Sequence, residues 1–527
     1  MAHNDRDRGN GQLPQSPEPY WREDIKLPAF PRLEEDLDVD IVIVGGGITG
    51  LTSAYLLVNE GFKVAVLEAG KILNGTTGHT TAKVTAQHGI IYDEFIQNIG
   101  KSRAKLYYEA NTEAINFVKK MVNEHNIDCD WSTQDAYIYA TTEHYARKLE
   151  REAKAYETLG IEGGLVDSIP FNIEIKNGLV MENQAQFHPL KYLAHLVQMI
   201  KDKGGRIFEE TVAVNIKPGE HPVILTREGS RVSARYVLSC SHFPFYEGKG
   251  FYFARMHADR SYILAVKTKE KYPSGMYISA EDPVRSLRSV IINGEDRVLI
   301  GGESHKTGQG KETLEHYKAL EAFADQVLGV EEILYRWSAQ DLVTLDKLPF
   351  IGPLTNGQPN LLVATGFRKW GMTNGTAAAL IFRDIVLGKS TPQQKLFTPS
   401  RFYLHPSLKN FLVENVDVAS HLIKGKLEAP NRKIEDFSHD EGGIVTIKGQ
   451  RKGAYKDKDG NVHIVDTTCT HLGCEVEWND GDRTWDCPCH GSRFSITGEV
   501  IEGPAEKPLQ HHDHNLLDNL TSEDSGY

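Results

Sequence analysis

Hydrophobic residues follow different patterns along this chain, and the changes between them predict several folded regions. Ile41 to Val44 is a continuous apolar run, as expected for a parallel strand that is buried on both faces. Residues 92–124, 144–159 and 187–205 predict helices, and the last of these ends in lysines and a glycine pair, a helix stop signal. In residues 251–300 apolar residues alternate with polar ones, which predicts strands.

The last third of the chain adds two further patterns. The segment NLLVATGFRKWGMTNGTAAALIFRDIV again predicts a strand, a turn and a helix, and a polar connection follows Pro392. From about 433 to 508, short strand-like runs with Gly and Asp turns predict a small β domain. The first 37 residues are polar and Pro-rich, and we expect them to form a disordered arm.

Length and charge limit the class of protein. A chain of 527 residues and 59.0 kDa predicts two or three domains. The net charge of -13 argues against nucleic acid or an anionic membrane as the main partner. No apolar run approaches the roughly 20 residues that span a bilayer, and the first residues lack the apolar core of a signal peptide. We therefore expect a cytoplasmic protein without a transmembrane segment.

The stretch VGGGITG predicts a dinucleotide site. Its pattern Gly45-x-Gly47-x-x-Gly50 follows an apolar strand, opens a helix through Ile48 and Thr49, and precedes an acid, Glu68, at the end of the next strand. The glycines permit a tight turn, close approach to a pyrophosphate and close packing of helix on strand. The acid is placed for ribose hydroxyls, which suits FAD or NAD. A glycine-rich turn without a ligand is the alternative.

Three ordered segments carry a family resemblance: NGTTGHTTAKVTAQHG, LDKLPFIGP and ATGFRKWGMTNGTAAA. With the glycine loop they resemble the FAD-dependent D-amino-acid oxidase superfamily, in particular its glycine and sarcosine oxidase branch, over residues 38–392. The resemblance implies an α/β FAD-binding (Rossmann-like) domain with an interleaved α+β substrate domain. Together the loop and the resemblance assign these FAD contacts: Gly45, Gly47, Ile48, Thr49, Gly50, Glu68, Ala69, Thr76, Thr77, His79, Thr80, Val212, Ala213, Gly366, Lys369, Trp370, Gly371, Met372 and Thr373.

The expected domain order follows from this resemblance and from the β-rich C-terminal region. We expect an arm at 1–37, an FAD-binding domain at 38–95, 185–250 and 339–395, a substrate domain at 96–184 and 251–338, a linker at 396–432, a β domain at 433–510 and a polar tail at 511–527.

Three interpretations of the role of His79 remain open. GTTGHTTA is similar to the GTTWHAAG stretch of dimethylglycine and sarcosine dehydrogenases, whose histidine carries FAD covalently, but Gly78 replaces the tryptophan. His79 therefore lines the flavin without a bond, carries it covalently, or only packs.

The substrate residues depart from the family pattern. Family oxidases hold a substrate carboxylate with arginines, whereas this chain has Asp341 at one such position and Lys369 at another. An amine, an N-methylated amino compound or an alcohol therefore fits the site as well as an α-amino acid does. The candidate catalytic residues are His257, Tyr262, Tyr277, Asp341 and Lys369. Arg260 lies between His257 and Tyr262 on one expected strand.

Four of the six cysteines gather in CTHLGC and CPCHGS; Cys129 and Cys240 stand apart. Cys469 with His471, and Cys487 with His490, each offer one thiolate and one imidazole, and their spacing differs from that of zinc fingers and ribbons. This is the ligand set of a Rieske [2Fe–2S] centre, so residues 433–508 resemble a small all-β Rieske domain. In cytochrome bc-type Rieske proteins the cysteines that match Cys474 and Cys489 form a disulfide, which the resemblance implies here.

The same resemblance sets expectations for the cluster's surroundings. Ser492 matches a serine that donates a hydrogen bond to a bridging sulfide, and GPAEKP matches the proline loop that covers the cluster. Phe494 stands where respiratory Rieske proteins have a tyrosine donor. We therefore expect a reduction potential within the Rieske range of about −150 to +300 mV but below the respiratory examples.

Together these features predict an FAD-dependent dehydrogenase that passes electrons through the cluster to an external acceptor, a protein or a quinone. His471 and His490, if they are exposed at the domain tip, would be the exit point. An oxidase with a redox-sensing cluster and an electron-transfer protein without its own small-molecule substrate are the alternatives.

Overall fold

The computed structural model describes residues 13–14, 17–401, 415, 418 and 432–512. The chain divides into two compact units, each described by itself below. The first unit comprises Met1–Tyr252, Ser261–Ser304 and Tyr317–Leu408; the second comprises Phe253–Arg260, His305–His316 and Lys409–Tyr527.

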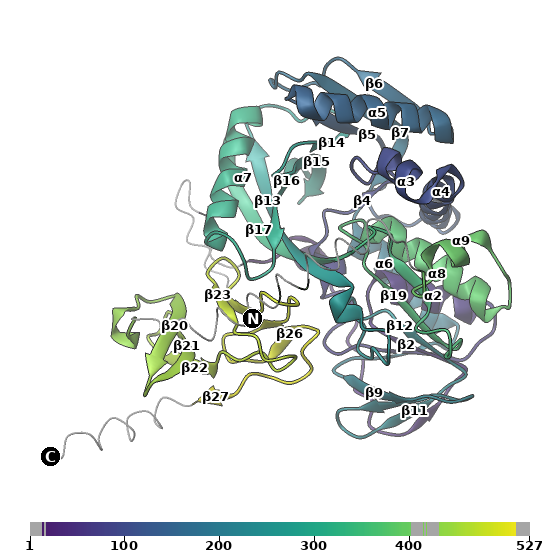
Figure 1. The fold of residues 1–527 in the computed structure, drawn as a ribbon, viewed down its shortest axis with the longest axis vertical. Coiled ribbons are helices and arrows are strands. Elements are labelled where there is room, and N and C mark those ends of the chain that lie inside the picture. The colour runs from purple at the N-terminus through teal and green to yellow at the C-terminus, as the bar shows by residue number, and fades with distance from the viewer. Residues whose placement is uncertain (1–12, 15–16, 402–414, 416–417, 419–431, 513–527) are drawn as a thin grey trace. The chain divides into compact units, whose positions relative to one another are not determined.

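A six-stranded sheet forms the centre of the first unit. Its order is β18-β19-β12-β2-β3-β8, parallel except for β18, and α2, α6 and α8 are among the helices beside it (Figure 1). All four residues of β2 are buried, which confirms the predicted parallel strand. The elements are β2 (Ile41–Val44), α2 (Ile48–Asn59), β3 (Val64–Leu67), α6 (Pro189–Asp202), β8 (Arg206–Phe208), β12 (Tyr236–Ser239), β18 (Phe350–Pro353), β19 (Leu361–Thr365) and α8 (Gly371–Val386).

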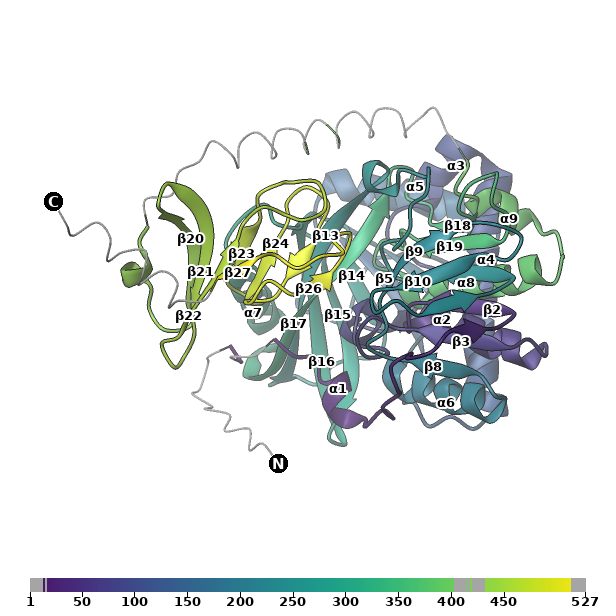
Figure 2. The same ribbon diagram turned by 90° about the horizontal axis from the view of Figure 1, so that it is seen from below.

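Two further sheets contain the other strands of sequence before residue 345. A small sheet has the order β1-β11-β10-β9, and a nine-stranded sheet has the order β17-β13-β16-β15-β14-β5-β7-β4 with β6 beside β7 (Figure 2). The small sheet contains β1 (Leu37–Asp38), β9 (Ala213–Lys217), β10 (Val223–Thr226) and β11 (Arg231–Ser233). The large sheet contains β4 (Lys83–Val84), β5 (Ser132–Ala140), β6 (Gly163–Val166), β7 (Asn177–Gln186), β13 (Met256–Thr268), β14 (Met276–Ser279), β15 (Arg285–Ile292), β16 (Glu295–Lys306) and β17 (Val330–Thr344).

The helix predicted over residues 92–124 is two helices, because Gly100 adopts φ 86° between them. A left-handed residue cannot continue a right-handed helix, and glycine adopts this conformation without steric cost. The other helices are α1 (Trp21–Asp24), α3 (Tyr92–Ile99), α4 (Lys101–Glu124), α5 (Glu143–Leu159), α7 (Thr313–Leu328) and α9 (Pro392–Phe397), with short 3-10 turns η1 (Thr76–His79), η2 (Tyr252–Ala254) and η3 (Ile434–Asp436).

The prediction of a disordered arm is wrong for the part of the arm that joins the fold. Tyr20 and Trp21 are buried, and the Trp21 indole donates to the Thr80 carbonyl at 2.9 Å. β1 pairs with β11, so the chain is folded before the glycine loop begins. The burial of two large aromatic side chains offsets part of the entropy that is lost when this polar segment is ordered. Residues 1–12 and 15–16 lie outside the described residues.

The second unit contains two four-stranded antiparallel sheets, which confirms the predicted small β domain. Trp485, Val476 and Phe494 pack in its core beside the four clustered cysteines. The sheets have the orders β20-β21-β22-β27 and β23-β24-β25-β26. Their strands are β20 (Glu441–Ile447), β21 (Gln450–Lys456), β22 (Val462–Asp466), β23 (Glu477–Asn479), β24 (Thr484–Asp486), β25 (Arg493–Phe494), β26 (Val500–Glu502) and β27 (His511–His512).

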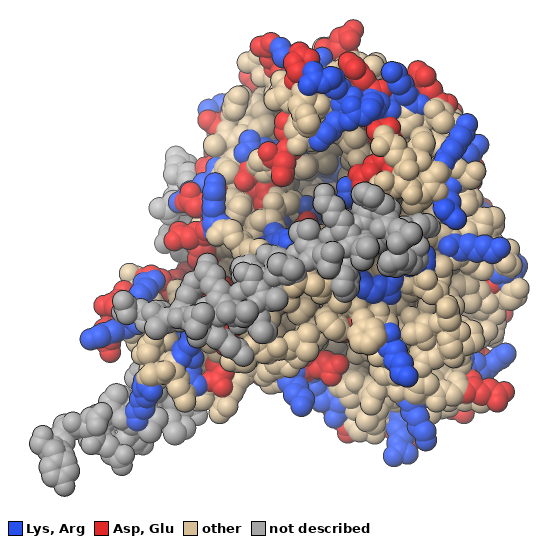
Figure 3. Space-filling view, in the orientation of Figure 1, with Lys and Arg blue, Asp and Glu red and all other residues tan. Residues whose placement is uncertain are grey.

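Among the described helices, none is both long and apolar enough to cross a bilayer. Basic and acidic side chains are interspersed over the described part of the face that Figure 3 shows. Such mixing suits a net charge that is spread over the surface.

Candidate functional site: a nucleotide cradle and a cysteine–histidine cluster

The glycine loop has the geometry that a bound pyrophosphate requires. Gly45 adopts φ 110°, and a Cβ on Gly50 would lie 2.0 Å from the Gly45 carbonyl oxygen, so no larger residue fits there. Helix α2 begins at Ile48 after Gly47, which carries no capping side chain. Because backbone N–H groups at such a helix start attract anions, the loop fits a dinucleotide phosphate.

Glu68 joins this loop to the strand where the adenine is expected. Its carboxylate accepts hydrogen bonds from the Gly46 and Gly70 amides at 2.8 and 2.9 Å, and Ala69 lies between these contacts. Burial raises the pKa of Glu68, although the backbone N–H groups oppose that rise. The Thr211 amide donates to the Glu68 carbonyl at 2.9 Å, immediately before Val212 and Ala213. The structure therefore brings these predicted residues together.

The turn from Gly366 to Thr373 is held in an unusual conformation. Gly366, Arg368 and Lys369 all have positive φ, at 76°, 49° and 69°. Trp370 precedes α8, which contains Gly371 and Met372, and its ring stacks on His88 at 4.8 Å. Consecutive non-glycine residues in this region are rare and cluster at functional sites.

His88 is a buried residue that the sequence did not single out. Its imidazole contacts the Tyr107 hydroxyl at 2.6 Å and the Thr373 hydroxyl at 3.1 Å. Burial, with the nearby Arg368, lowers the pKa of His88 to about 3, so the ring is neutral at physiological pH. A lone histidine before a glycine carries no motif, and only the tertiary contacts with Arg368, Trp370 and Thr373 link it to the turn from Gly366 to Thr373.

The 3-10 turn η1 contains Thr76, Thr77 and His79 and is followed by Thr80. The Thr77 hydroxyl accepts a hydrogen bond from the Ile48 amide at 3.1 Å, which places this turn against the start of α2. A Cβ at Gly78 would lie 2.3 Å from the Leu73 carbonyl oxygen. The tryptophan of the GTTWHAAG pattern therefore cannot occupy this position while the backbone stays as it is.

Lys369 reaches the large sheet. Its ammonium contacts the Ser304 hydroxyl, which lies 3.1 Å from the Ser261 hydroxyl on the neighbouring strand. Asp341, on β17, is buried. Asp341 and Lys369, the residues at the two altered family positions, both belong to the first unit. Lys369 contacts Ser304, and Ser304 in turn contacts Ser261.

Two further cationic side chains, Lys83 and Arg288, lie near η1. Lys83 follows η1 closely in sequence, and Arg288 contacts the residues just after it. Arg288 is 3% exposed and donates from Nη1 to the Thr81 and Ala82 carbonyls at 2.7 and 2.9 Å. Burial, with the charge of Arg288, lowers the pKa of Lys83 to about 7, although its side chain is only half-buried. The nearby positive charge of Arg288 therefore disfavours the protonated form of Lys83.

The remaining catalytic candidates have different surroundings. The Tyr262 ring packs edge-on against Tyr317 of α7 at 4.9 Å, so it points to the opposite face of β13 from Ser261. The Tyr277 hydroxyl donates to the Ser274 carbonyl at 2.7 Å. His257 belongs to the second unit, 3.6 Å from Asp259. The structure therefore does not gather these three side chains in one place.

The second unit brings the predicted cluster residues together. Cys469 and Cys487 are 2% and 1% exposed, and the rings of His471 and His490 lie 5.0 Å apart at 90°. A hydrogen bond from Cys487 is the main reason why the pKa of Cys469 falls to about 7, so one thiol of the pair ionises readily. Burial lowers the pKa of both histidines to about 4. A thiolate and neutral imidazoles are the forms that bind iron.

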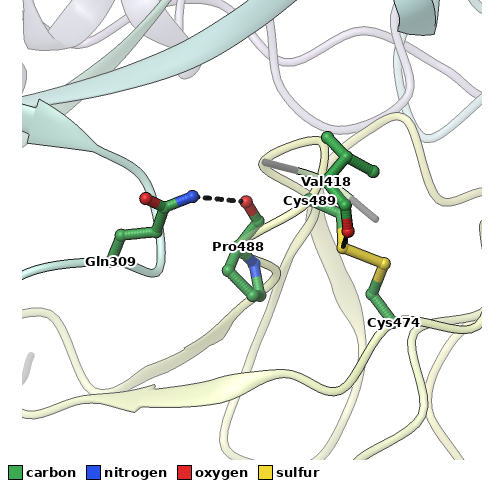
Figure 4. The surroundings of a disulfide bond; sticks show 5 residues. All are labelled: Gln309, Val418, Cys474, Pro488 and Cys489. Atoms are coloured by element: carbon green, nitrogen blue, oxygen red, sulfur yellow. Dashed lines mark hydrogen bonds between the residues drawn. A yellow bond between two sulfur atoms is a disulfide. The ribbon is translucent and has the colours of Figure 1, made fainter. Parts of the chain in front are cut away.

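Cys474 and Cys489 form a disulfide, with Cα atoms 6.5 Å apart (Figure 4). The sulfur atoms of Cys474, Cys487 and Cys489 all lie within 4.8 Å of one another. Because two of these sulfurs are bonded to each other, only Cys487 of this trio can supply a thiolate ligand. The disulfide therefore ties the loop of Cys469 to the loop of Cys487.

The two loops have the same backbone pattern. The Gly473 amide donates to the Cys469 carbonyl and the Gly491 amide to the Cys487 carbonyl, both at 3.0 Å, and the two glycines adopt φ 78° and 79°. This conformation favours glycine and turns each chain back toward its cysteine. Two equivalent loops that converge on one point are suited to hold a cluster between them.

The segment GPAEKP closes over both loops. The Ser492 hydroxyl accepts from the Ala505 amide at 3.0 Å, and the Thr470 hydroxyl donates to the Lys507 carbonyl at 2.6 Å. Phe494 is fully buried and offers no donor. His490 is 7% exposed, so the condition that it lies open at a domain tip is not met.

Comparison with known families gives two matches that together cover most of the chain. The model of the FAD dependent oxidoreductase family (DAO) matches residues 40–385, and the model of the Rieske [2Fe-2S] domain matches residues 429–513. The two matches fall on the nucleotide cradle and on the cysteine–histidine cluster, respectively.

Individual proteins agree with these matches. YhfW of Bacillus subtilis (strain 168), named as a Rieske 2Fe-2S iron-sulfur protein, is 55% identical over 95% of this chain and 98% of its own length. Gamma-glutamylputrescine oxidoreductase of Escherichia coli (strain K12) is 24% identical over 69% of this chain and 87% of its own. The cytochrome b6-f complex iron-sulfur subunit of Chlorobaculum thiosulfatiphilum is 34% identical over 31% of this chain and 78% of its own.

A solved structure gives the same fold for the first part. Glycine oxidase from Geobacillus kaustophilus aligns with a TM-score of 0.59 and 19% identity, covering 69% of this chain and 99% of its own. This likeness shows the fold alone.

Proposed function

Because the chain belongs to the family of FAD-dependent oxidoreductases and carries a Rieske [2Fe-2S] domain, we propose that it is a dehydrogenase with an internal electron relay. In this proposal it oxidises a small amine, an N-methylated amino compound or an alcohol. Electrons then pass through the cluster to an external one-electron acceptor, a protein or a quinone. The presence of both domains in one chain is the observation that carries the proposal.

The electron count explains why the two groups belong together. Oxidation of a C–N or C–OH bond removes two electrons and two protons from the substrate and leaves an imine or a carbonyl. FAD accepts two electrons together and can release them singly, while a Rieske centre carries one. Each turnover therefore needs two equivalents of a one-electron acceptor.

The proposed roles follow the two sites. Gly45, Gly47 and Gly50, with Glu68, would hold the dinucleotide part of FAD, and the turn before α8 would lie against the flavin ring. In the second unit the proposed iron ligands are Cys469, His471, Cys487 and His490, and Cys474 and Cys489 brace the loops that carry them.

Anaerobic mixing tests the function. The reconstituted protein is mixed with amines, N-methylated glycines and hydroxy acids while flavin bleaching and the signal of the reduced cluster are recorded separately. We expect a true substrate to bleach the flavin first and to reduce the cluster afterwards. A substrate that bleaches the flavin but never reduces the cluster would contradict the relay.

One alternative has its own support. Asp341 and Lys369 stand where the family's amino-acid oxidases have arginines, which favours an electron-transfer protein reduced by a partner rather than by a small molecule. If no small molecule bleaches the flavin while a reduced carrier protein does, this alternative replaces the dehydrogenase.

A further inference from the structure

Two segments far from the Rieske domain in sequence belong to the same structural unit. They are Phe253–Arg260 and His305–His316, and we call them the collar. The first ends next to Ser261 and the second begins next to Ser304, the two serines whose hydroxyls are linked to Lys369 of the flavin turn. The collar is thus a direct continuation of the strands β13 and β16 that carry these serines.

Phe253, in the first collar segment, lies over the candidate histidine ligands. Its ring centre is 6.0 Å from that of His471 and 5.6 Å from that of His490, edge-on in both cases. Together the three rings form one aromatic group. Phe253 therefore covers part of the edge that carries the histidines, where His490 is buried and His471 is half-buried.

The second collar segment packs on the loop of Cys487. A Cβ on Gly308 would lie 2.7 Å from the Pro488 nitrogen, so the two backbones are in close contact, and Gly308 has φ 70°. The side-chain amide of Gln309 donates from Nε2 to the Pro488 carbonyl at 3.2 Å (Figure 4). The Thr307 amide donates to the Ala258 carbonyl at 2.9 Å, which joins the two collar segments to each other.

Buried charges fix the collar to the β domain. Arg260 is fully buried and lies 3.3 Å from Asp482, 3.6 Å from Asp486 and 3.6 Å from Glu502. At the other segment, Asp480 accepts from the Thr313 amide at 2.9 Å and so caps the first turn of α7. A buried guanidinium remains stable only while its carboxylates stay in place, so this contact is specific.

We infer that the collar seals the histidine edge of the cluster, with Phe253 as the positioning residue, so that an external electron acceptor must approach another part of the domain. This inference rests on the proposed relay, because it states where the acceptor of that relay can approach the cluster.

The test uses full-length protein with FAD and the cluster reconstituted, and it needs no substrate. The protein is reduced with half a mole of dithionite per mole of chain, which supplies one electron, and the paramagnetic signal verifies that this electron resides on the cluster; the protein is then mixed with ferricyanide, which takes that electron. Loss of the cluster's paramagnetic signal gives the rate. Phe253→Ala is compared with Phe251→Ala, which removes a phenylalanine that is 61% exposed two residues earlier.

We expect Phe253→Ala to speed this oxidation about tenfold, the lower end of effects seen on removing an outer partner at a metal site, and Phe251→Ala to leave it unchanged. The midpoint potential should rise in Phe253→Ala. Reduction adds a negative charge to a cluster that is neutral with two thiolates and two neutral imidazoles, and water at the opened edge stabilises that charge.

Equal rates and potentials in Phe253→Ala and the wild type would overturn the inference. If Phe253→Ala fails to retain iron, Phe253→Val, which removes the ring and most of its bulk but keeps a small apolar side chain, serves instead, and a rate equal to that of the wild type again refutes the inference. Failure of the proposed dehydrogenase would appear separately, as the absence of flavin bleaching by any substrate, and would leave these rates untouched.

Discussion

Replacement of Arg260 by methionine tests whether the collar is an integral part of the β domain. In the wild type two guanidinium groups, Arg260 and Arg493, share a buried site with Asp482, Asp486 and Glu502. In Arg260→Met a single guanidinium remains for three carboxylates. The variant keeps similar apolar volume, so the main change is the loss of one buried charge.

The distances set the size of the effect. With an effective dielectric constant near 20, each contact of Arg260 at 3.3 to 3.6 Å contributes an attraction of about 5 kcal/mol. Desolvation and repulsion from Arg493 offset most of the sum. Removal of one partner from a buried pair typically costs about 3–5 kcal/mol, and we expect the free energy of unfolding of the second unit to fall by this amount.

Urea unfolding followed by tryptophan fluorescence, to which Trp485 in the core of that unit and Trp478 packed against it contribute, measures this loss. With a slope of about 1–2 kcal/mol per molar urea, the midpoint should fall by at least about 1.5 M. Arg432→Met is the matched control, because it removes an exposed ion pair with Glu441, worth about 0–1 kcal/mol. If Arg260→Met shifts the midpoint no further than this control, the buried network does not hold the collar.

The pH dependence of stability provides a second test of the buried network of arginines and carboxylates. Burial raises the pKa of Asp486, but Arg493 and Arg260 outweigh it, so the pKa of Asp486 is lowered overall. A lowered carboxyl pKa contributes stability that is complete above the unfolded pKa and is lost as the pH falls through the folded pKa. In Arg260→Met this loss should begin at a higher pH than in the wild type.

Four further changes test the sites. Gly50→Ala should abolish FAD binding, measured as flavin per chain, because its Cβ would meet a backbone oxygen at 2.0 Å; retention of full flavin contradicts the cradle. Acid precipitation should release FAD into the supernatant, because the segment departs from the covalent pattern at Gly78, where a side chain would meet the Leu73 carbonyl oxygen; a yellow pellet refutes this. The double variant Cys474→Ser, Cys489→Ser should lose about 3 kcal/mol in a denaturation series, as expected for a closed loop of 15 residues, and unchanged stability would show that the disulfide is dispensable. Because burial lowers the pKa of Lys83 to about 7, stability should decrease as the pH falls from the usual lysine range toward 7, and Lys83→Met should remove this contribution; the same pH profile in the variant and the wild type contradicts it.

Local sequence was sufficient where one short segment contains a whole structural requirement. The glycine loop combines a buried strand, a turn that only glycine permits and a helix start within ten residues, so its structure was predictable. The two cluster loops likewise contain their ligands and their turn glycines, Gly473 and Gly491, within a few residues. The break at Gly100 was missed because glycine inside a helical pattern is usually tolerated, and only the φ value reveals the interruption.

Features that depend on partners distant in sequence could not be predicted in this way. The sequence analysis places Arg260 on an expected strand that carries catalytic candidates. In the structure its side chain is buried among carboxylates that lie more than two hundred residues further along the chain. A strand residue can face either side of a sheet with the same local sequence, and only the presence of Asp482, Asp486 and Glu502 makes burial of a guanidinium favourable. His88 and Lys83 pose the same problem, because their altered pKa values result from tertiary burial.

The collar also shows that the β domain is completed by residues far from it in sequence. Phe253, Gln309 and Arg260 belong to the same unit as the cluster loops and contact those loops or the strands that support them. Arg260 is buried among carboxylates of that unit and holds the first collar segment, so its loss should loosen Phe253 over the histidine rings. Arg260→Met should therefore speed oxidation of the cluster by ferricyanide as Phe253→Ala does, and an unchanged rate would show that the buried network does not position Phe253.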